Sequence, residues 1–110
     1  MSNPLHPLCT ELQSVVSTHV VSVQQAFDAY QNECFTKRPP EFFCLELCGE
    51  AGELANLEKK LWKGASIPMD HVNDEAADVF ISLMNYANAR GIDLASAVAD
   101  KLSRIKTAKG

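Results

Sequence analysis

The sequence predicts a single all-α domain folded as a four-helix bundle. Apolar residues recur at the 3.6-residue period of a helix through most of the chain. The five glycines and five prolines fall almost entirely between these periodic segments. The length of 110 residues corresponds to one domain, residues 1–110. Any active site must therefore be built within one small core or between copies of it.

The first helix is expected to begin after Pro7. The segment 10–13 (Thr-Glu-Leu-Gln) has the form of a capping box, and apolar residues follow at helical spacing as far as Tyr30. The valine-rich run 15–23 would also suit a strand. We favour a helix because the period persists for about twenty residues, far longer than a usual strand.

Prolines and glycines set the bounds of the next two helices. Pro40 suits a first helical turn, so the second helix is expected over residues 40–63, ending at Gly64. After a loop, Asp70 is the expected N-cap of the third helix, which should end at Gly91.

The fourth helix should begin at Asp93 as N-cap. Its apolar stripe extends over residues 94–105. No internal repeat or coiled-coil heptad interrupts this four-helix pattern.

The third helix is apolar around most of its circumference. The residues concerned are Val72, Ala76, Ala77, Val79, Phe80, Ile81, Leu83, Met84 and Ala87. Such a helix must be covered on all sides, which three other short helices can scarcely do. We therefore expect a bundle completed by oligomerisation, as a homodimer or homotetramer. The alternative is a monomer with this helix at its centre.

Charge and composition exclude several classes of protein. Ten basic against fourteen acidic side chains give a net charge of −4, so no basic field attracts a nucleic acid polymer. No apolar run approaches ~18 residues, and residues 1–4 lack the order of an export signal, so we expect a cytoplasmic protein without a membrane partner. The four cysteines are accordingly expected to be reduced.

Each of the two middle helices carries a row of polar side chains beside its apolar face. The row on the second helix consists of Glu46, Glu50 and Glu53. The row on the third helix consists of Glu75, Asp78, Ser82 and Asn85. Acids are seldom placed where they must lose water, and two such rows on consecutive antiparallel helices can face each other.

Carboxylates gathered in this way need a positive partner. Unit charges 4 Å apart repel by roughly 4 kcal/mol at an effective dielectric constant near 20. Lys60 lies near the acidic row and is one alternative, but a divalent cation neutralises several carboxylates at once. The spacing offers only oxygen ligands and lacks the Glu-x-x-His pairs of di-iron bundles. Mg²⁺, or Mn²⁺ as a substitute, is therefore the expected ion.

Two acidic segments together resemble the signature of the MazG-like all-α nucleoside triphosphate pyrophosphohydrolases. The segments are Leu47-Cys-Gly-Glu50-Ala-Gly-Glu53-Leu54 and Glu75-Ala-Ala-Asp78-Val79, with 21 residues between Glu53 and Glu75. The likeness continues through Gly91-Ile-Asp-Leu94 to Lys101, so it covers about residues 40–105. It implies the four-helix fold of the all-α NTP pyrophosphatase type.

The resemblance implies both a metal site and a reaction. It assigns Mg²⁺ to Glu50, Glu53, Glu75 and Asp78. Water would attack the α-phosphorus of a (deoxy)nucleoside triphosphate and release a monophosphate and pyrophosphate, as in house-cleaning of the nucleotide pool. Phosphoryl-type displacement needs chiefly charge neutralisation and alignment, which bound metal ions supply. The expected catalytic residues are Glu46, Glu50 and Glu53. Glu46, one turn before Glu50, is the candidate for accepting the proton of the attacking water.

Four further residues are expected to bind substrate. The indole of Trp62 could stack on a base or form part of the core, and Lys63 could contact phosphate. Asn85 could hydrogen-bond to sugar or base, and Lys101 matches the basic residue that the family carries there. Ser82 stands where relatives often carry tyrosine, so the resemblance does not imply a base preference. The basic end continues through Arg104, Lys106 and Lys109.

A different class of function remains open. The same bundle could be a non-catalytic module that senses nucleotides or binds a partner helix. The complete set of four acids weighs against this alternative, because a protein released from metal binding has no reason to keep clustered like charges. A carboxylate-bridged redox bundle is disfavoured by the missing histidines.

Overall fold

The computed structural model describes residues 5–107 and confirms the all-α prediction. Its four helices are α1 (Pro7–Cys34), α2 (Pro40–Trp62), α3 (Met69–Arg90) and α4 (Leu94–Leu102), and residues 5–107 contain no strand. All four cysteines are free thiols. None of the helices within residues 5–107 has the length and hydropathy that crossing a membrane requires.

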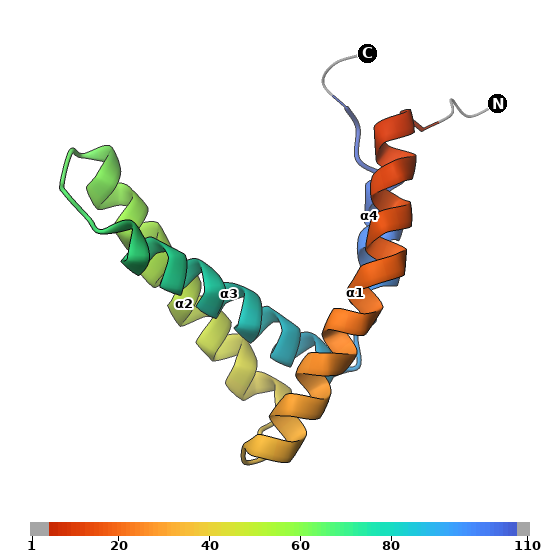
Figure 1. The fold of residues 1–110 in the computed structure, drawn as a ribbon, viewed down its shortest axis with the longest axis horizontal. Coiled ribbons are helices and arrows are strands. Elements are labelled where there is room, and N and C mark those ends of the chain that lie inside the picture. The colour runs from red at the N-terminus through yellow and green to blue at the C-terminus, as the bar shows by residue number, and fades with distance from the viewer. Residues whose placement is uncertain (1–4, 108–110) are drawn as a thin grey trace.

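The helices form two arms of an open V (Figure 1). One arm is the antiparallel pair of α2 and α3, and the other is α1 with the short α4 packed along its N-terminal half. The arms meet where the C-terminal half of α1 contacts α3, and there the rings of Phe27 and Phe80 lie 5.9 Å apart. The molecule measures 48 × 42 × 21 Å along its principal axes.

Glycines end two helices as predicted. Gly91 has a left-handed backbone, with φ of 77°, and its N–H caps the carbonyl groups at the end of α3. Gly64, with φ of 91°, follows the last residues of α2. Only glycine adopts this conformation without strain, so both ends are fixed by the residue type.

Two of the predicted helix caps are wrong, although the first helix begins close to the expected residue. The first helix begins at Pro7 rather than with Thr10 as its cap, and the Leu8 N–H donates to Nδ1 of His6 over 3.0 Å. The third begins at Met69 after Pro68, so Asp70 lies in the first turn instead of capping it. In both cases proline sets the backbone angle at the entry to the helix.

The predicted cap of the fourth helix is confirmed, and its predicted length is not. Asp93 accepts a hydrogen bond from the Ser96 N–H over 3.3 Å. The helix ends at Leu102, so Ile105 lies beyond it. Near this end the Ser103 hydroxyl donates to the Asp100 carbonyl over 2.6 Å, a local bond of the kind that competes with a regular helix.

Side-chain amides of α1 hold the α3–α4 connection in place. The Gln24 side chain donates to the Ile92 carbonyl and accepts from the Leu94 N–H over 3.0 Å. Asn88 donates to the Gln24 carbonyl over 3.0 Å. Nearer the start of α1, Gln13 donates to a carbonyl of α4 over 2.8 Å. The Gln24 side chain thereby satisfies two backbone groups that the short loop would leave without partners.

The core of a single chain is small. Within residues 5–107 the buried hydrophobic residues are Phe43, Met84, Ala87 and Ala95. The radius of gyration is 17.0 Å, whereas a compact chain of this length has about 13 Å. The accessible surface is 8198 Å², about 2000 Å² more than the mass predicts. Phe80 and Ile81 remain 46% and 41% exposed, so one chain does not cover the apolar circumference of α3.

Replacing Gln24 with leucine should destabilise the fold by about 1–3 kcal/mol, because it leaves the Ile92 carbonyl and the Leu94 N–H without partners. Urea unfolding at fixed protein concentration measures the loss. The same substitution at the exposed neighbour Gln25 is the matched control and should cost less than about 0.5 kcal/mol. Equal losses in the two variants would contradict the role of Gln24.

Candidate functional site

The antiparallel packing of α2 and α3 brings the two acidic rows together. Carboxylate oxygens of Glu50, Glu75 and Asp78 lie within 4.8 Å of one another. All three side chains are half-buried at the contact between the helices. Spacings of three and four residues place acids on the same face of a helix, and the short loop after α2 returns α3 alongside it. We call Glu50, Glu53, Glu75 and Asp78 the acidic cluster.

Two oxygens of the acidic cluster have no partner. Oε2 of Glu50 and Oε2 of Glu75 are enclosed and accept no hydrogen bond within the described chain. Residues 5–107 form one salt bridge, between Arg104 and Asp100 of α4. Neither Lys60 nor any other described cation therefore pairs with the carboxylates of the acidic cluster. Enclosed acceptors without donors are costly, and their lone pairs are available to a ligand.

The pKa of Glu75 shows how closely the acids approach. The largest cause is the hydrogen bond that a protonated Glu75 can donate to Glu53, followed by desolvation and a similar bond to Glu50; together they raise this pKa from 4.5 to about 7. Glu53 therefore lies beside the other three acids, although its side chain is exposed. Near neutral pH a proton on Glu75 takes the place that a cation would otherwise fill.

The acidic cluster has the donor chemistry of a hard divalent cation. It offers carboxylate oxygen alone, two of its oxygens are unsatisfied, and its net negative charge has no protein counter-charge within residues 5–107. Mg²⁺ and Mn²⁺ prefer such ligands, whereas zinc and copper sites draw on histidine or cysteine. The residues that could hold the ion are those of the acidic cluster.

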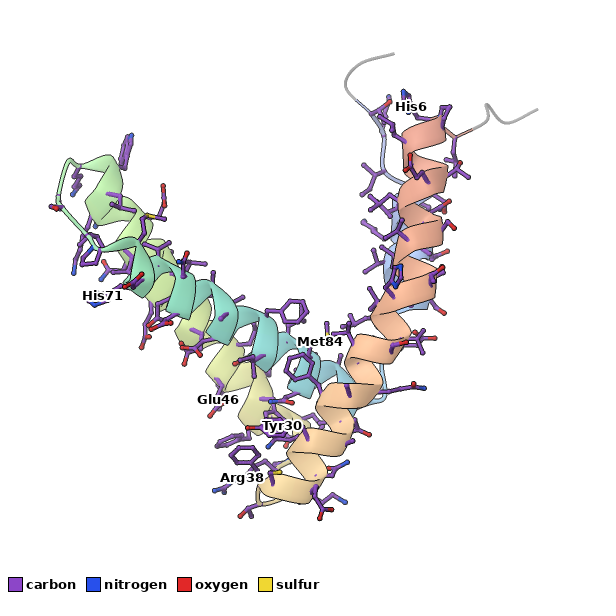
Figure 2. The ribbon with its side chains drawn as sticks, viewed as in Figure 1. His6, Tyr30, Arg38, Glu46, His71 and Met84 are labelled. Carbon is purple, nitrogen blue, oxygen red and sulfur yellow. The ribbon has the colours of Figure 1, made fainter. Side chains whose placement is uncertain are left out.

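A hollow flanks the acidic cluster on each side along the α2/α3 arm. Toward the loop between the two helices, about 380 Å³ is lined by Glu53, Glu75, Asn56, His71 and Asp74. Toward the joint of the V, about 410 Å³ reaches from Glu46 to Asn85. Figure 2 shows Glu46 and His71 well apart along this arm.

Glu46 lies outside the acidic cluster. It is one turn before Glu50 on α2, its side chain is exposed, and it lines the hollow on the side of the joint. Its carboxylate is therefore not among the oxygens that converge with those of Glu50, Glu75 and Asp78.

The four residues expected to bind substrate lie in three places. Trp62 is 84% exposed at the end of α2, next to the exposed Lys63. Asn85 is only 8% exposed and lies near the opposite end of the arm. Lys101 is on α4, which belongs to the other arm. One chain does not bring these four together, and the predicted basic residue Lys109 lies outside the described residues.

Several residues that line the flanking hollows escaped prediction. Arg38 lies in the segment between α1 and α2, where no helical period marks a facing side chain. Asn56 and Asp74 line the hollow toward the α2–α3 loop. Their positions could have indicated this, because Asn56 follows Glu53 by three residues and Asp74 directly precedes Glu75.

Comparisons with models of protein families, with curated proteins and with solved structures found no match to this chain. The function of the chain must therefore be inferred from the geometry of the acidic cluster and from the two acidic segments that form it.

The metal-free protein should lose stability as the pH rises from 5 to 8. The folded state binds a proton on Glu75 up to about pH 7, whereas an unfolded chain releases it near pH 4.5, so the free energy of unfolding falls across this range. Thermal unfolding in EDTA measures the effect.

In the Glu75→Gln variant this fall should largely disappear, and at pH 8 the variant should melt above the unmodified protein. Glu53→Gln should also raise the melting temperature in EDTA, because either change removes one repelling charge. Two results would contradict the electrostatic account. In one, the melting temperature of the unmodified protein does not change with pH; in the other, it rises with pH more steeply than that of Glu75→Gln.

Proposed function

We propose that this chain is a Mg²⁺-dependent nucleoside triphosphate pyrophosphohydrolase that acts on the nucleotide pool of the cytoplasm. The observation that carries the proposal is the convergence of Glu50, Glu75 and Asp78, with unpartnered oxygens on two of them, at the motif that resembles the MazG-like family. The substrate is a (deoxy)nucleoside triphosphate, and the products are a monophosphate and pyrophosphate.

The acidic cluster would hold the metal, with Mn²⁺ as a substitute for Mg²⁺. When bound, the ion neutralises the phosphate charge and lowers the pKa of water in its coordination sphere. The chain itself supplies the packed α2/α3 pair that brings the carboxylates of Glu50, Glu75 and Asp78 together, with Glu53 beside them. Glu46 is exposed and outside the acidic cluster, so its carboxylate is available to accept a proton from the attacking water.

The surface of the single chain supports oligomerisation as part of the proposal. The excess of about 2000 Å² over a compact monomer is the area that an obligate homodimer of this kind buries on each subunit. Exposed apolar side chains on α1, α3 and α4 include Val15, Phe80 and Val98, at 50%, 46% and 37%. A homodimer or homotetramer would cover them.

Substituting an acid of the cluster should abolish hydrolysis. Removing a residue that only supports a metal ligand lowers metal affinity or activity about ten- to a hundredfold. Glu50 and Asp78 are proposed ligands themselves, so Glu50→Gln and Asp78→Asn should each lower kcat/KM by more than about a hundredfold. The assay incubates the protein with mixed deoxynucleoside triphosphates and Mg²⁺ and separates the products.

Glu58→Gln on α2 is the matched control, since Glu58 is exposed and outside the acidic cluster. It should keep at least about half of the activity. Release of a diphosphate and orthophosphate would contradict the proposed cleavage position. Nucleotide binding without turnover would favour the non-catalytic sensing module instead.

The unmodified protein should sediment as a dimer or tetramer of its 12.1 kDa chain. Phe80→Glu should shift this equilibrium toward the monomer, because it places a charge on an apolar surface at the joint of the V. Leu45→Glu is the control, since Leu45 is 75% exposed on α2. A monomer at tens of micromolar concentration would contradict oligomerisation.

A further inference from the structure

A wide hollow lies at the joint of the V. It holds about 620 Å³ between the end of α1, the segment before α2 and the last turns of α3. Its lining includes the neutral amides Gln31, Asn32, Asn85 and Asn88.

This space adjoins the smaller hollow that lies on the joint side of the acidic cluster. Gln31, Arg38, Phe43 and Asn85 line both this hollow and the smaller one beside Glu46. The smaller hollow also reaches Ile81, one turn from Asp78. We call the two together the joint hollow.

We propose that the joint hollow binds the base of the nucleotide and that Asn85 selects bases carrying an exocyclic amino group. Cytosine and adenine nucleotides would be preferred over their uracil and hypoxanthine counterparts. The inference rests on the proposed function and adds to it the placement and class of the base.

The distance along the helices suits this placement. Asn85 follows Asp78 by seven residues, and Phe43 precedes Glu50 by seven. Two helical turns span about 10 Å. With the α-phosphate at the acidic cluster, the sugar and base extend over this length into the joint hollow.

The hydrogen bonding of Asn85 favours an amino group. Its side chain is 8% exposed, and its Nδ2 donates to Oε1 of Gln31 over 3.3 Å. The Asn85 carbonyl oxygen accepts none of the side-chain hydrogen bonds formed within residues 5–107. An exocyclic amino group can donate to this oxygen. A keto group in the same position would face another acceptor unless the Asn85 amide turned over, which would give up its hydrogen bond to Gln31.

An apolar wall stands beside the amides. Phe43, 5% exposed, lines the joint hollow, and its ring lies 5.4 Å from that of Phe42. The guanidinium of Arg38 lies 4.9 Å from the centre of the Phe42 ring. Aromatic and guanidinium planes of this kind are suited to stacking with a base.

The opposite end of the arm suits the phosphates better than the base. Trp62 is 84% exposed there and offers no enclosed surface. Lys59, Lys60 and Lys63 gather at the end of α2, where their charges complement a pyrophosphate group. Lys37 and Arg38 line the joint hollow as well as Asp28, so its charge alone does not choose between base and phosphates. Its neutral amides and the buried ring of Phe43 favour the base. The base is therefore placed at the joint.

The test compares nucleotides that differ only in the amino or keto group. Isothermal titration of the full-length protein with dCMP and dUMP measures base binding without any turnover, and dCTP/dUTP and dATP/dITP pairs measure kcat/KM. We expect the amino member of each pair to be favoured by about tenfold or more, because a buried unpaired acceptor is costly. In Asn85→Leu the ratios should fall to about twofold or less, while Asn73→Leu, an exposed position on α3, should keep them.

The outcomes separate this inference from the proposed function. Hydrolysis with equal kcat/KM for both members of each pair would overturn the inference and leave the enzyme intact. Preferential binding of dCMP that depends on Asn85, without hydrolysis, would support the joint hollow and overturn the enzyme. An Arg38→Ala variant with a higher KM for triphosphates and unchanged dCMP binding would indicate the reverse orientation and overturn the inference. The dCMP/dUMP comparison on the unmodified protein decides the matter even if Asn85→Leu does not fold.

Discussion

The proximity of like charges between α2 and α3 is the constraint on which the site depends. Glu50, Glu53, Glu75 and Asp78 approach closely enough to move the pKa of Glu75 to about 7. No described lysine or arginine offsets them. The α2/α3 pair must therefore hold its acids against electrostatic repulsion, and apolar packing between the helices supplies the opposing force. Loading with a divalent cation would turn this repulsion into a stabilising contact.

Hydrogen bonds of side-chain amides connect the helices of a chain whose apolar core is small. Gln13 and Gln24 attach α4 and its preceding loop to α1, and Gln31 joins α1 to Asn85 of α3. The last of these bonds lies where the two arms meet and also lines the joint hollow. A ligand in that hollow would contact both arms, so its binding and the angle of the V are coupled through the same pair of amides.

The sequence predicts the parts of this structure that residue type or helical period determines locally. Gly64 and Gly91 end helices because they adopt positive φ, and the acidic rows meet because consecutive helices pack antiparallel. Thr10 and Asp70 were misread as caps because proline can start a helix earlier. The separation of Trp62, Asn85 and Lys101 could not be foreseen, since it depends on how the arms diverge. Arg38 lay in a segment without a period, where nothing local indicates what it faces.

The open V also limits what one chain can contribute to catalysis. Lys101 lies on α4, packed along α1, while the acidic cluster lies on the diverging α2/α3 arm (Figure 1). A side chain of α4 that reached phosphates at an acidic cluster would therefore come from another copy of the chain. The exposed apolar side chains on α1, α3 and α4 are those that a second copy would cover. Oligomerisation and completion of the site would then have one cause, because part of this exposed apolar surface, on α1 and α4, lies on the same arm as Lys101.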